Sequence, residues 1–182
     1  GGQLYGENHI GLPKVIALEA IINNLCGGDS IHPDTDAITE EGFAPSPVCI
    51  SAFDNMSARK ILFNAWSTTY GDAIHAYFID GRMLAEGGQV FLVQGGNKTQ
   101  IEEYKKTLFE DGEVKDQPCT MKATSHCGAF IAALMTSLMT NHAANLESIK
   151  AGKTPVRNTP FATRFELPLF MLETYDDSKS FI

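Results

Sequence analysis

Short apolar runs alternate with segments of helical periodicity along this chain, and that alternation constrains its fold more than any other feature. The runs that predict β-strands cover residues 46–53, 73–83 and 88–96, and the segments that predict helices cover residues 57–70, 98–109 and 126–150. Strands that alternate with helices favour an α/β architecture, in which helices cover a sheet. We therefore expect a single α/β domain over residues 1–182.

The two ends of the chain carry weaker signals. Residues 13–26 predict a helix with Pro13 in its first turn, because apolar residues recur at helical spacing before a Gly-Gly stop. Residues 29–38 predict a short strand and turn. Residues 164–175 predict a last extended segment, in which Pro168 indicates an edge strand or a bulge.

Charge and cysteine content limit the classes of partner. The net charge is −8 and there is no basic stripe, which argues against nucleic-acid binding. The longest apolar run, residues 129–139, is too short to cross a bilayer, and no signal sequence opens the chain. Four cysteines without CxxC spacing are typical of reduced thiols. These features predict a cytoplasmic protein that binds neither nucleic acid nor membrane.

The segment AFDNMSAR places polar residues where ligands bind in open α/β sheets, at the carboxyl end of a predicted strand. Asp54 could hold Mg²⁺, Asn55 offers an amide beside it, and Arg59 lies one helical turn further on, within reach of a phosphate. The alternative is that Asp54 or Ser57 only caps the following helix.

Two other residues have both a functional and a structural interpretation. Lys14 stands at the start of a predicted helix, where free N–H groups favour anions, although a solvated lysine is the commoner outcome. Cys119 lies in a polar loop, where Lys122 and His126 could lower the pKa of its thiol, or it is a structural cysteine. Cys127, at the start of an apolar helix, is interpreted as a packing residue.

Two kinds of active site fit the sequence poorly. A structural zinc site would need a second close pair of ligands beside Cys119 and Cys127, and Cys26 and Cys49 do not provide one. A serine hydrolase would need GxSxG, which is missing although Ser125 and His126 are adjacent. No zinc is therefore expected.

Taken in order, these segments resemble the ThiF/MoeB/ubiquitin-activating superfamily. QLYGENHIGLPK is similar to the family's RQ…GxPK segment, DNMSAR matches its Asp-Asn-x-x-x-Arg motif, and PCTMK looks like the PxCTxK around its thioester cysteine with one residue fewer. The resemblance covers roughly residues 3–150. It implies a Rossmann-like three-layer domain that adenylates the C-terminal carboxylate of a ubiquitin-like or sulfur-carrier protein.

The resemblance also implies roles for single residues. Gln3 and Lys14 match ATP-site positions, and Asp54 and Asn55 match the nucleotide- and Mg²⁺-associated pair. Arg59 would neutralise charge on the phosphates, and Cys119 would receive the acyl group as a thioester. Family members are commonly dimers, so the resemblance allows a homodimer.

The chain also departs from the family pattern. The family's first strand and Gly-rich phosphate loop have no counterpart here, so we expect them to precede residue 1 in a larger protein. The family's two CxxC pairs are absent, which implies a zinc-free branch. Two alternatives stay open: a catalytically incomplete module that acts in protein binding or assembly, and half of a dinucleotide-dependent oxidoreductase, whose GxGxxG is not visible.

Overall fold

The computed structural model describes residues 5–28, 31–39, 43–109 and 124–176. The chain divides into two compact units, Gly1–Ile38 and Thr39–Ile182. The expectation of one domain over residues 1–182 stays a prediction.

The first unit contains a short 3₁₀ helix, Glu7–His9, and helix α1, Lys14–Cys26. The predicted helix is confirmed, with Pro13 immediately before its first turn and Gly27 ending it at a φ of 68°. The strand predicted at 29–38 is wrong for the described residues 31–38, which form no strand. Their run of Asp, Pro and Thr favours turns over a regular ladder.

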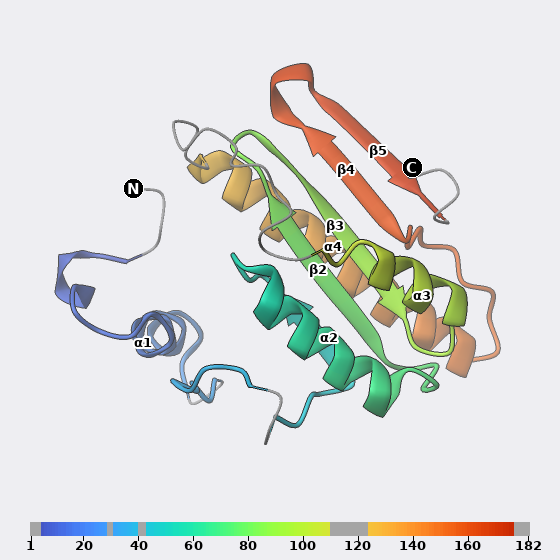
Figure 1. Cartoon of the computed structure of the whole chain (residues 1–182), viewed down its shortest axis with the longest axis horizontal. Helices are drawn as coiled ribbons and strands as arrows, with labels where there is room; N and C mark the ends of the chain where they lie inside the picture. Colours follow the sequence, from blue (N-terminus) through green and yellow to red (C-terminus); the bar gives the residue numbers. More distant parts are fainter. Residues whose placement is uncertain (1–4, 29–30, 40–42, 110–123, 177–182) are drawn as a thin grey trace. The chain divides into compact units, whose positions relative to one another are not determined.

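The second unit is built on a five-stranded mixed sheet with the strand order β1-β2-β3-β4-β5. Its strands are β1 Val48–Ser51, β2 Tyr77–Met83, β3 Gly87–Gln94, β4 Ala162–Glu166 and β5 Met171–Tyr175. Strands β1 and β2 pair in parallel, and the later pairs are antiparallel. The α/β expectation is confirmed (Figure 1).

Helices cover both faces of this sheet. They are α2 Met56–Tyr70, α3 Lys98–Lys106 and α4 Ser125–Lys150. Aromatic residues of α2 and α3 pack on one face, where Phe63 and Tyr104 meet Phe78 of β2. Helix α4 packs on the opposite face (Figure 1).

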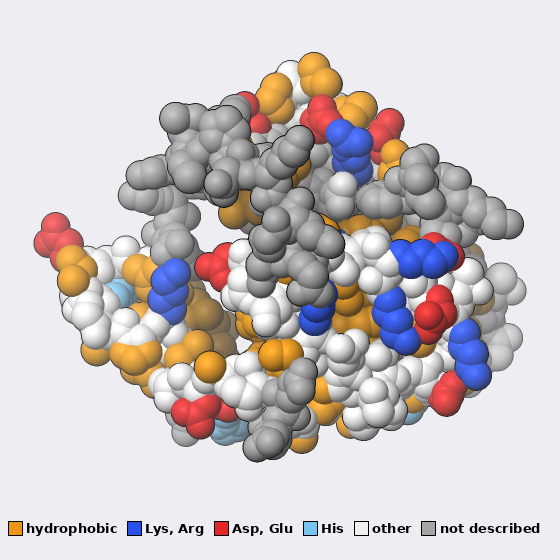
Figure 2. Space-filling model, in the orientation of Figure 1, with side chains coloured by type: hydrophobic (Ala, Val, Ile, Leu, Met, Phe, Trp, Pro, Cys, Tyr) orange, Lys and Arg blue, Asp and Glu red, His pale blue; other side chains and the backbone are white. Residues whose placement is uncertain are grey.

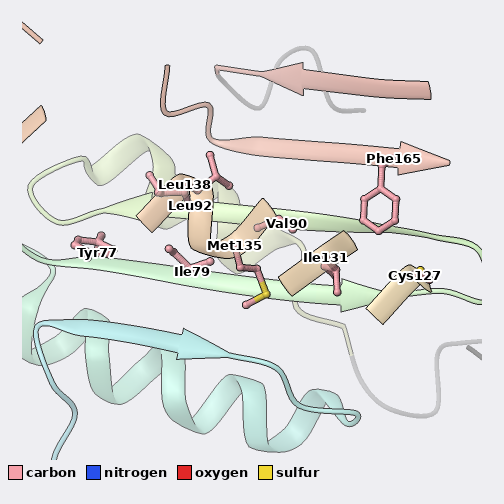
Figure 3. Packing of buried hydrophobic residues seen from close by; sticks show 9 residues of the cluster. All are labelled: Tyr77, Ile79, Val90, Leu92, Cys127, Ile131, Met135, Leu138 and Phe165. Atoms are coloured by element: carbon pink, nitrogen blue, oxygen red, sulfur yellow. The ribbon is translucent and has the colours of Figure 1, made fainter. Parts of the chain in front are cut away.

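Strand β2 divides its side chains between the two layers because successive residues point to opposite faces. Tyr77 and Ile79 join the cluster under α4, which also contains Val90 and Met135 (Figure 3). The next side chain, that of Asp80, is completely buried on the other face, among residues of α2 and α3. This alternation places a carboxylate inside an aromatic layer.

Two strand expectations need correction. The apolar run at residues 46–53 predicts a buried strand, but Val48 and Ile50 of β1 are exposed, because β1 lies at the edge of the sheet and α4 packs on β2 and β3. The extended segment 164–175 is a hairpin: Pro168 lies in a 3₁₀ turn between β4 and β5, not in a strand or a bulge. Phe170, with a φ of 49°, reverses the chain.

Among the helices in the described part of the chain, none combines the length and the apolar character that a membrane crossing requires.

Candidate functional site

A pocket of about 860 Å³ opens where the parallel strands β1 and β2 end. Its walls come from the loop after β1, the end of β2 and the first half of α4. Asp54, Asn55 and Arg59 all line it, so the structure brings these three predicted residues together. The position agrees with the general rule that ligands bind outside the carboxyl ends of strands in α/β sheets.

Asn55, rather than Asp54 or Ser57, caps helix α2. Its Oδ1 accepts a hydrogen bond from the backbone N–H of Ala58 at 2.8 Å, and its Nδ2 donates to Oδ1 of Asp54 at 3.3 Å. Asn55 has an extended backbone, as a capping residue requires. The carboxylate of Asp54 is therefore not used by the cap, and it stays exposed at the rim of the pocket.

Arg59 is only 4% exposed, and its guanidinium is held by internal partners. It forms a salt bridge with Asp80 and donates further hydrogen bonds to the carbonyls of Phe53 and Gly81. Its Nε is buried without a partner among the described residues. Burial, together with the nearby charge of Arg82, lowers the pKa of Arg59 to about 10, so the side chain is charged at neutral pH.

Arg82 binds the other oxygen of the same carboxylate. Its Nε donates to Oδ2 of Asp80 at 2.7 Å, and its terminal nitrogens donate to the carbonyl and hydroxyl of Thr107 at 2.9 and 2.8 Å. The guanidinium carbon lies 4.7 Å from the ring centroid of Phe91, in a cation–π contact. Tyr104 also donates to Oδ2 of Asp80, at 2.9 Å.

The charges of this network do not balance. Two arginines meet one aspartate, and burial raises the pKa of Tyr104, which keeps its phenol neutral. Among the described residues, Arg59 and Arg82 thus carry one positive charge more than Asp80 at the floor of the pocket, whose rim carries the exposed carboxylate of Asp54. Because a buried charge is costly without a partner, this floor favours an anionic group.

Sequence reasoning did not identify Asp80, Arg82 or Tyr104 as site residues. Asp80 and Arg82 fall within the strand predicted at residues 73–83, which assigns them no role in a site. Their spacing of two residues was a usable signal, since residues i and i+2 of a strand share a face. Two charges on one face of an otherwise apolar strand indicate an internal ion pair.

The remaining predicted site residues lie elsewhere. Lys14 belongs to the first unit, where it lines a separate pocket of about 350 Å³ together with Tyr5. Gln3 and Cys119 lie outside the described residues, as does Lys122. Cys127 is confirmed as a packing residue: it lies in the first turn of α4 and is completely buried in the cluster between this helix and the sheet, and burial raises the pKa of its thiol.

The described residues on either side of Cys119 are attached at this edge of the sheet. Thr107, just after α3, accepts two hydrogen bonds from Arg82, one at its carbonyl oxygen and one at its hydroxyl oxygen. Thr124, the N-cap of α4, donates its backbone N–H to the carbonyl of Ala85 at 3.2 Å, just beyond β2. Thr107 and Thr124, described residues on either side of position 119, are therefore both attached next to the end of β2.

Within the described residues, no group of three or more His, Cys, Asp or Glu side chains converges as a metal site. At the pocket, Asp54 is the side chain that offers an accessible carboxylate, and its hard oxygen ligands suit Mg²⁺. Comparison of the sequence with models of known protein families and with curated proteins found no match.

Proposed function

We propose that this chain carries the nucleotide site of an ATP-dependent adenylating enzyme of the ThiF type, which activates the C-terminal carboxylate of a ubiquitin-like or sulfur-carrier protein. The observation that carries the proposal is that Asp54 and Arg59, the two charged residues of the Asp-Asn-x-x-x-Arg motif, line one pocket at the carboxyl end of the parallel strands. Negative and positive groups at that position suit a metal-bound polyphosphate.

In the proposed reaction, a carboxylate oxygen of the carrier protein attacks the α-phosphorus of ATP. The bond from that phosphorus to the bridging oxygen breaks, and pyrophosphate leaves. Mg²⁺ would screen the phosphate charges when bound, and Asp54 is the residue that would hold it. The positive charge by which Arg59 and Arg82 exceed Asp80 among the described residues would stabilise negative charge that develops on the phosphate oxygens.

Cys119 would act in a second step, in which its thiolate sulfur attacks the acyl carbon of the adenylate and AMP leaves. A role for Cys119 at this pocket is supported by Thr107 and Thr124, the described residues on either side of it that are attached beside the end of β2. Changing Cys119 to serine should leave MgATP binding intact and prevent a thiol-sensitive adduct with the carrier protein.

Thermal unfolding with and without MgATP tests the nucleotide site. A ligand that binds only the folded state raises its stability by RT ln(1 + [L]/Kd), about 2.7 kcal/mol at a hundredfold excess over Kd. We expect MgATP to raise the unfolding temperature of the natural chain and of a Glu147→Ala control, an exposed carboxylate at the end of α4. The shift should disappear in Asp54→Ala.

One observation favours a second candidate, a catalytically incomplete module that serves in protein binding or assembly. Arg59 is engaged by Asp80 and by the carbonyl of Phe53, as expected of an arginine that stabilises the fold. If MgATP leaves the unfolding temperature of the natural chain unchanged, this second function is preferred. A shift that persists in Asp54→Ala would also contradict the proposed site.

A further inference from the structure

Arg82 is the more accessible of the two arginines that line the pocket at the end of β1 and β2. Its side chain is 16% exposed, against 5% for that of Arg59. The terminal nitrogens of Arg59 donate to Asp80 and to the carbonyls of Phe53 and Gly81. Arg59 therefore holds the loop after β1 against β2, whereas Arg82 has exposed surface at which a ligand can bind.

The sheet presents Arg82 to the pocket together with a second polar side chain. Gln89 lies directly opposite Arg82 on β3 and lines the pocket as well. Side chains directly opposite each other in an antiparallel pair project from the same face of the sheet. Arg82 and Gln89 therefore form one polar stretch of the pocket floor.

The terminal nitrogens of Arg82 are held by neutral acceptors and keep donors in reserve. Nη1 donates to the carbonyl oxygen of Thr107 at 2.9 Å and Nη2 to its hydroxyl oxygen at 2.8 Å, while Nε donates to Asp80. Each terminal nitrogen carries two N–H groups. The second N–H of each has no acceptor among the described residues, so both can donate to the oxygens of an anion.

Thr107 fixes the orientation of this guanidinium group. The Thr107 hydroxyl donates its own proton to the carbonyl of Tyr104 at 2.7 Å, so towards Arg82 it can only accept. The guanidinium carbon also lies 4.7 Å from the ring centroid of Phe91 and 5.3 Å from that of Tyr104. A side chain that is already held in place loses less conformational entropy when a ligand binds.

The surface around the pocket offers anions little general attraction. The net charge of the chain is −8, and in several places Lys and Arg side chains lie beside acidic ones (Figure 2). The pairs of Lys105 with Glu102 and of Lys106 with Glu103 are examples. Binding of an anion therefore needs a placed donor rather than a basic patch.

We infer that Arg82 is the arginine that binds the anionic group of the ligand in this pocket, and that Thr107 is a positioning residue for its guanidinium. The choice of a nucleotide phosphate as that anionic group rests on the proposed function. The role of Arg82 rests on its own contacts, because the residue lies outside the Asp-Asn-x-x-x-Arg motif.

Calorimetric titration of the folded chain with MgATP, and in parallel with magnesium pyrophosphate, tests the role of Arg82. Arg82→Met should weaken binding of both ligands about tenfold or more, because charged donors are lost while Asp80 keeps Arg59 as its counter-charge. Arg157→Met removes an exposed arginine that does not line the pocket, and this control should bind as the natural chain does.

A pair of variants tests the positioning role of Thr107. Thr107→Val keeps the shape of the side chain but removes the hydroxyl, and should weaken binding about fivefold. Thr107→Ser keeps the hydroxyl and should restore the affinity. In a chain that already carries Arg82→Met, Thr107→Val should have no further effect on affinity, because Thr107 acts through Arg82.

The results separate this inference from the proposed function. Pyrophosphate binding that is lost in Arg82→Met supports the inference even if MgATP does not bind, an outcome that would contradict the proposed function alone. Unchanged affinity in Arg82→Met, or a natural chain that binds neither ligand, overturns the inference. Equal affinity of the Thr107→Val and Thr107→Ser variants overturns the role of Thr107.

Circular dichroism of each variant before titration excludes loss of structure as the cause of lost binding. If Arg82→Met does not fold, the comparison of Thr107→Val with Thr107→Ser decides, because a purely structural Thr107 would change stability and leave the affinity of the folded chain unchanged.

Discussion

Asp80 lies 21 residues beyond Arg59 in the sequence, yet its carboxylate accepts a hydrogen bond from the Arg59 guanidinium in the layer between β2 and α2. Because Arg59 also donates to the carbonyl of Phe53, this pair joins the loop after β1 to the neighbouring strand. The geometry of the pocket therefore depends on an aspartate that lies beneath it.

Changing Asp80 to asparagine should destabilise the chain by about 3–5 kcal/mol, because the buried Arg59 and the partly buried Arg82 lose their counter-charge. Unfolding in urea, followed by circular dichroism, measures the loss. The same change in a chain that already carries Arg59→Met and Arg82→Met should cost much less, since no buried charge is then left unpaired. A loss below about 1 kcal/mol in the natural background would contradict the ion-pair account.

Asn55 should contribute to stability through its cap on α2. Changing Asn55 to alanine should cost about 1 kcal/mol, because the N–H of Ala58 loses its acceptor, whereas Asn55→Ser should cost little. Chemical denaturation compares the two. Equal stability of the alanine and serine variants would show that the cap is unimportant.

Local patterns predicted the regular elements well, and they failed where a residue's role depends on distant parts of the chain. The periodicity of α2 and α4 was sufficient to predict both helices. Whether Asn55 or Asp54 caps the helix depends on the backbone angles, which the neighbouring residues in the sequence do not predict. The partnership of Asp80 with Arg59 depends on two segments that meet only in the folded chain.

The C-terminal hairpin shows another limit of sequence reasoning. Pro168 is compatible with an edge strand, a bulge or a turn. The turn forms because Phe170 adopts a left-handed conformation, which is uncommon for a residue other than glycine. Nothing in the local sequence pointed to that conformation.

Two glycines should respond to alanine in opposite ways. Gly95→Ala should destabilise the chain by about 2 kcal/mol or more, because the new methyl group meets the backbone oxygens of Ala73 and Tyr70 at 2.2 and 2.9 Å. A methyl group at Gly128, inside α4, would meet only the sulfur of Met83 within 4 Å among the described residues, so Gly128→Ala should stabilise the chain by about 0.5–1 kcal/mol. Thermal unfolding of both variants shows whether each one is less or more stable than the natural chain. A change in the same direction for both would contradict the packing described.

His142 should make stability fall in mild acid. Burial lowers its pKa below the ordinary value of 6.5, so the unfolded chain binds a proton at this residue before the folded chain does. The contribution is fully present above pH 6.5 and is lost as the pH falls from there towards the lower folded-state pKa. Tyr77, the ring against His142, has a raised pKa and stays neutral in this range.

Unfolding free energies at a series of pH values between 8 and 5 measure this loss, with His142→Phe as the comparison. The variant should lose less stability than the natural chain over that range. Parallel curves for the two proteins would show that the folded state accepts the proton as readily as the unfolded state.

Successive side chains of β2 point to opposite faces of the sheet, and this limits insertions and deletions within the strand. Tyr77 and Ile79 belong to the layer under α4, whereas Asp80 belongs to the layer with the arginines. Deleting one residue within the strand would turn every later side chain to the opposite face, so a carboxylate would enter the apolar layer and an aliphatic chain would face the guanidinium groups. Over evolution, β2 should therefore accept single substitutions but not insertions or deletions. Changes in length are tolerated better in a turn, such as the one around Pro168.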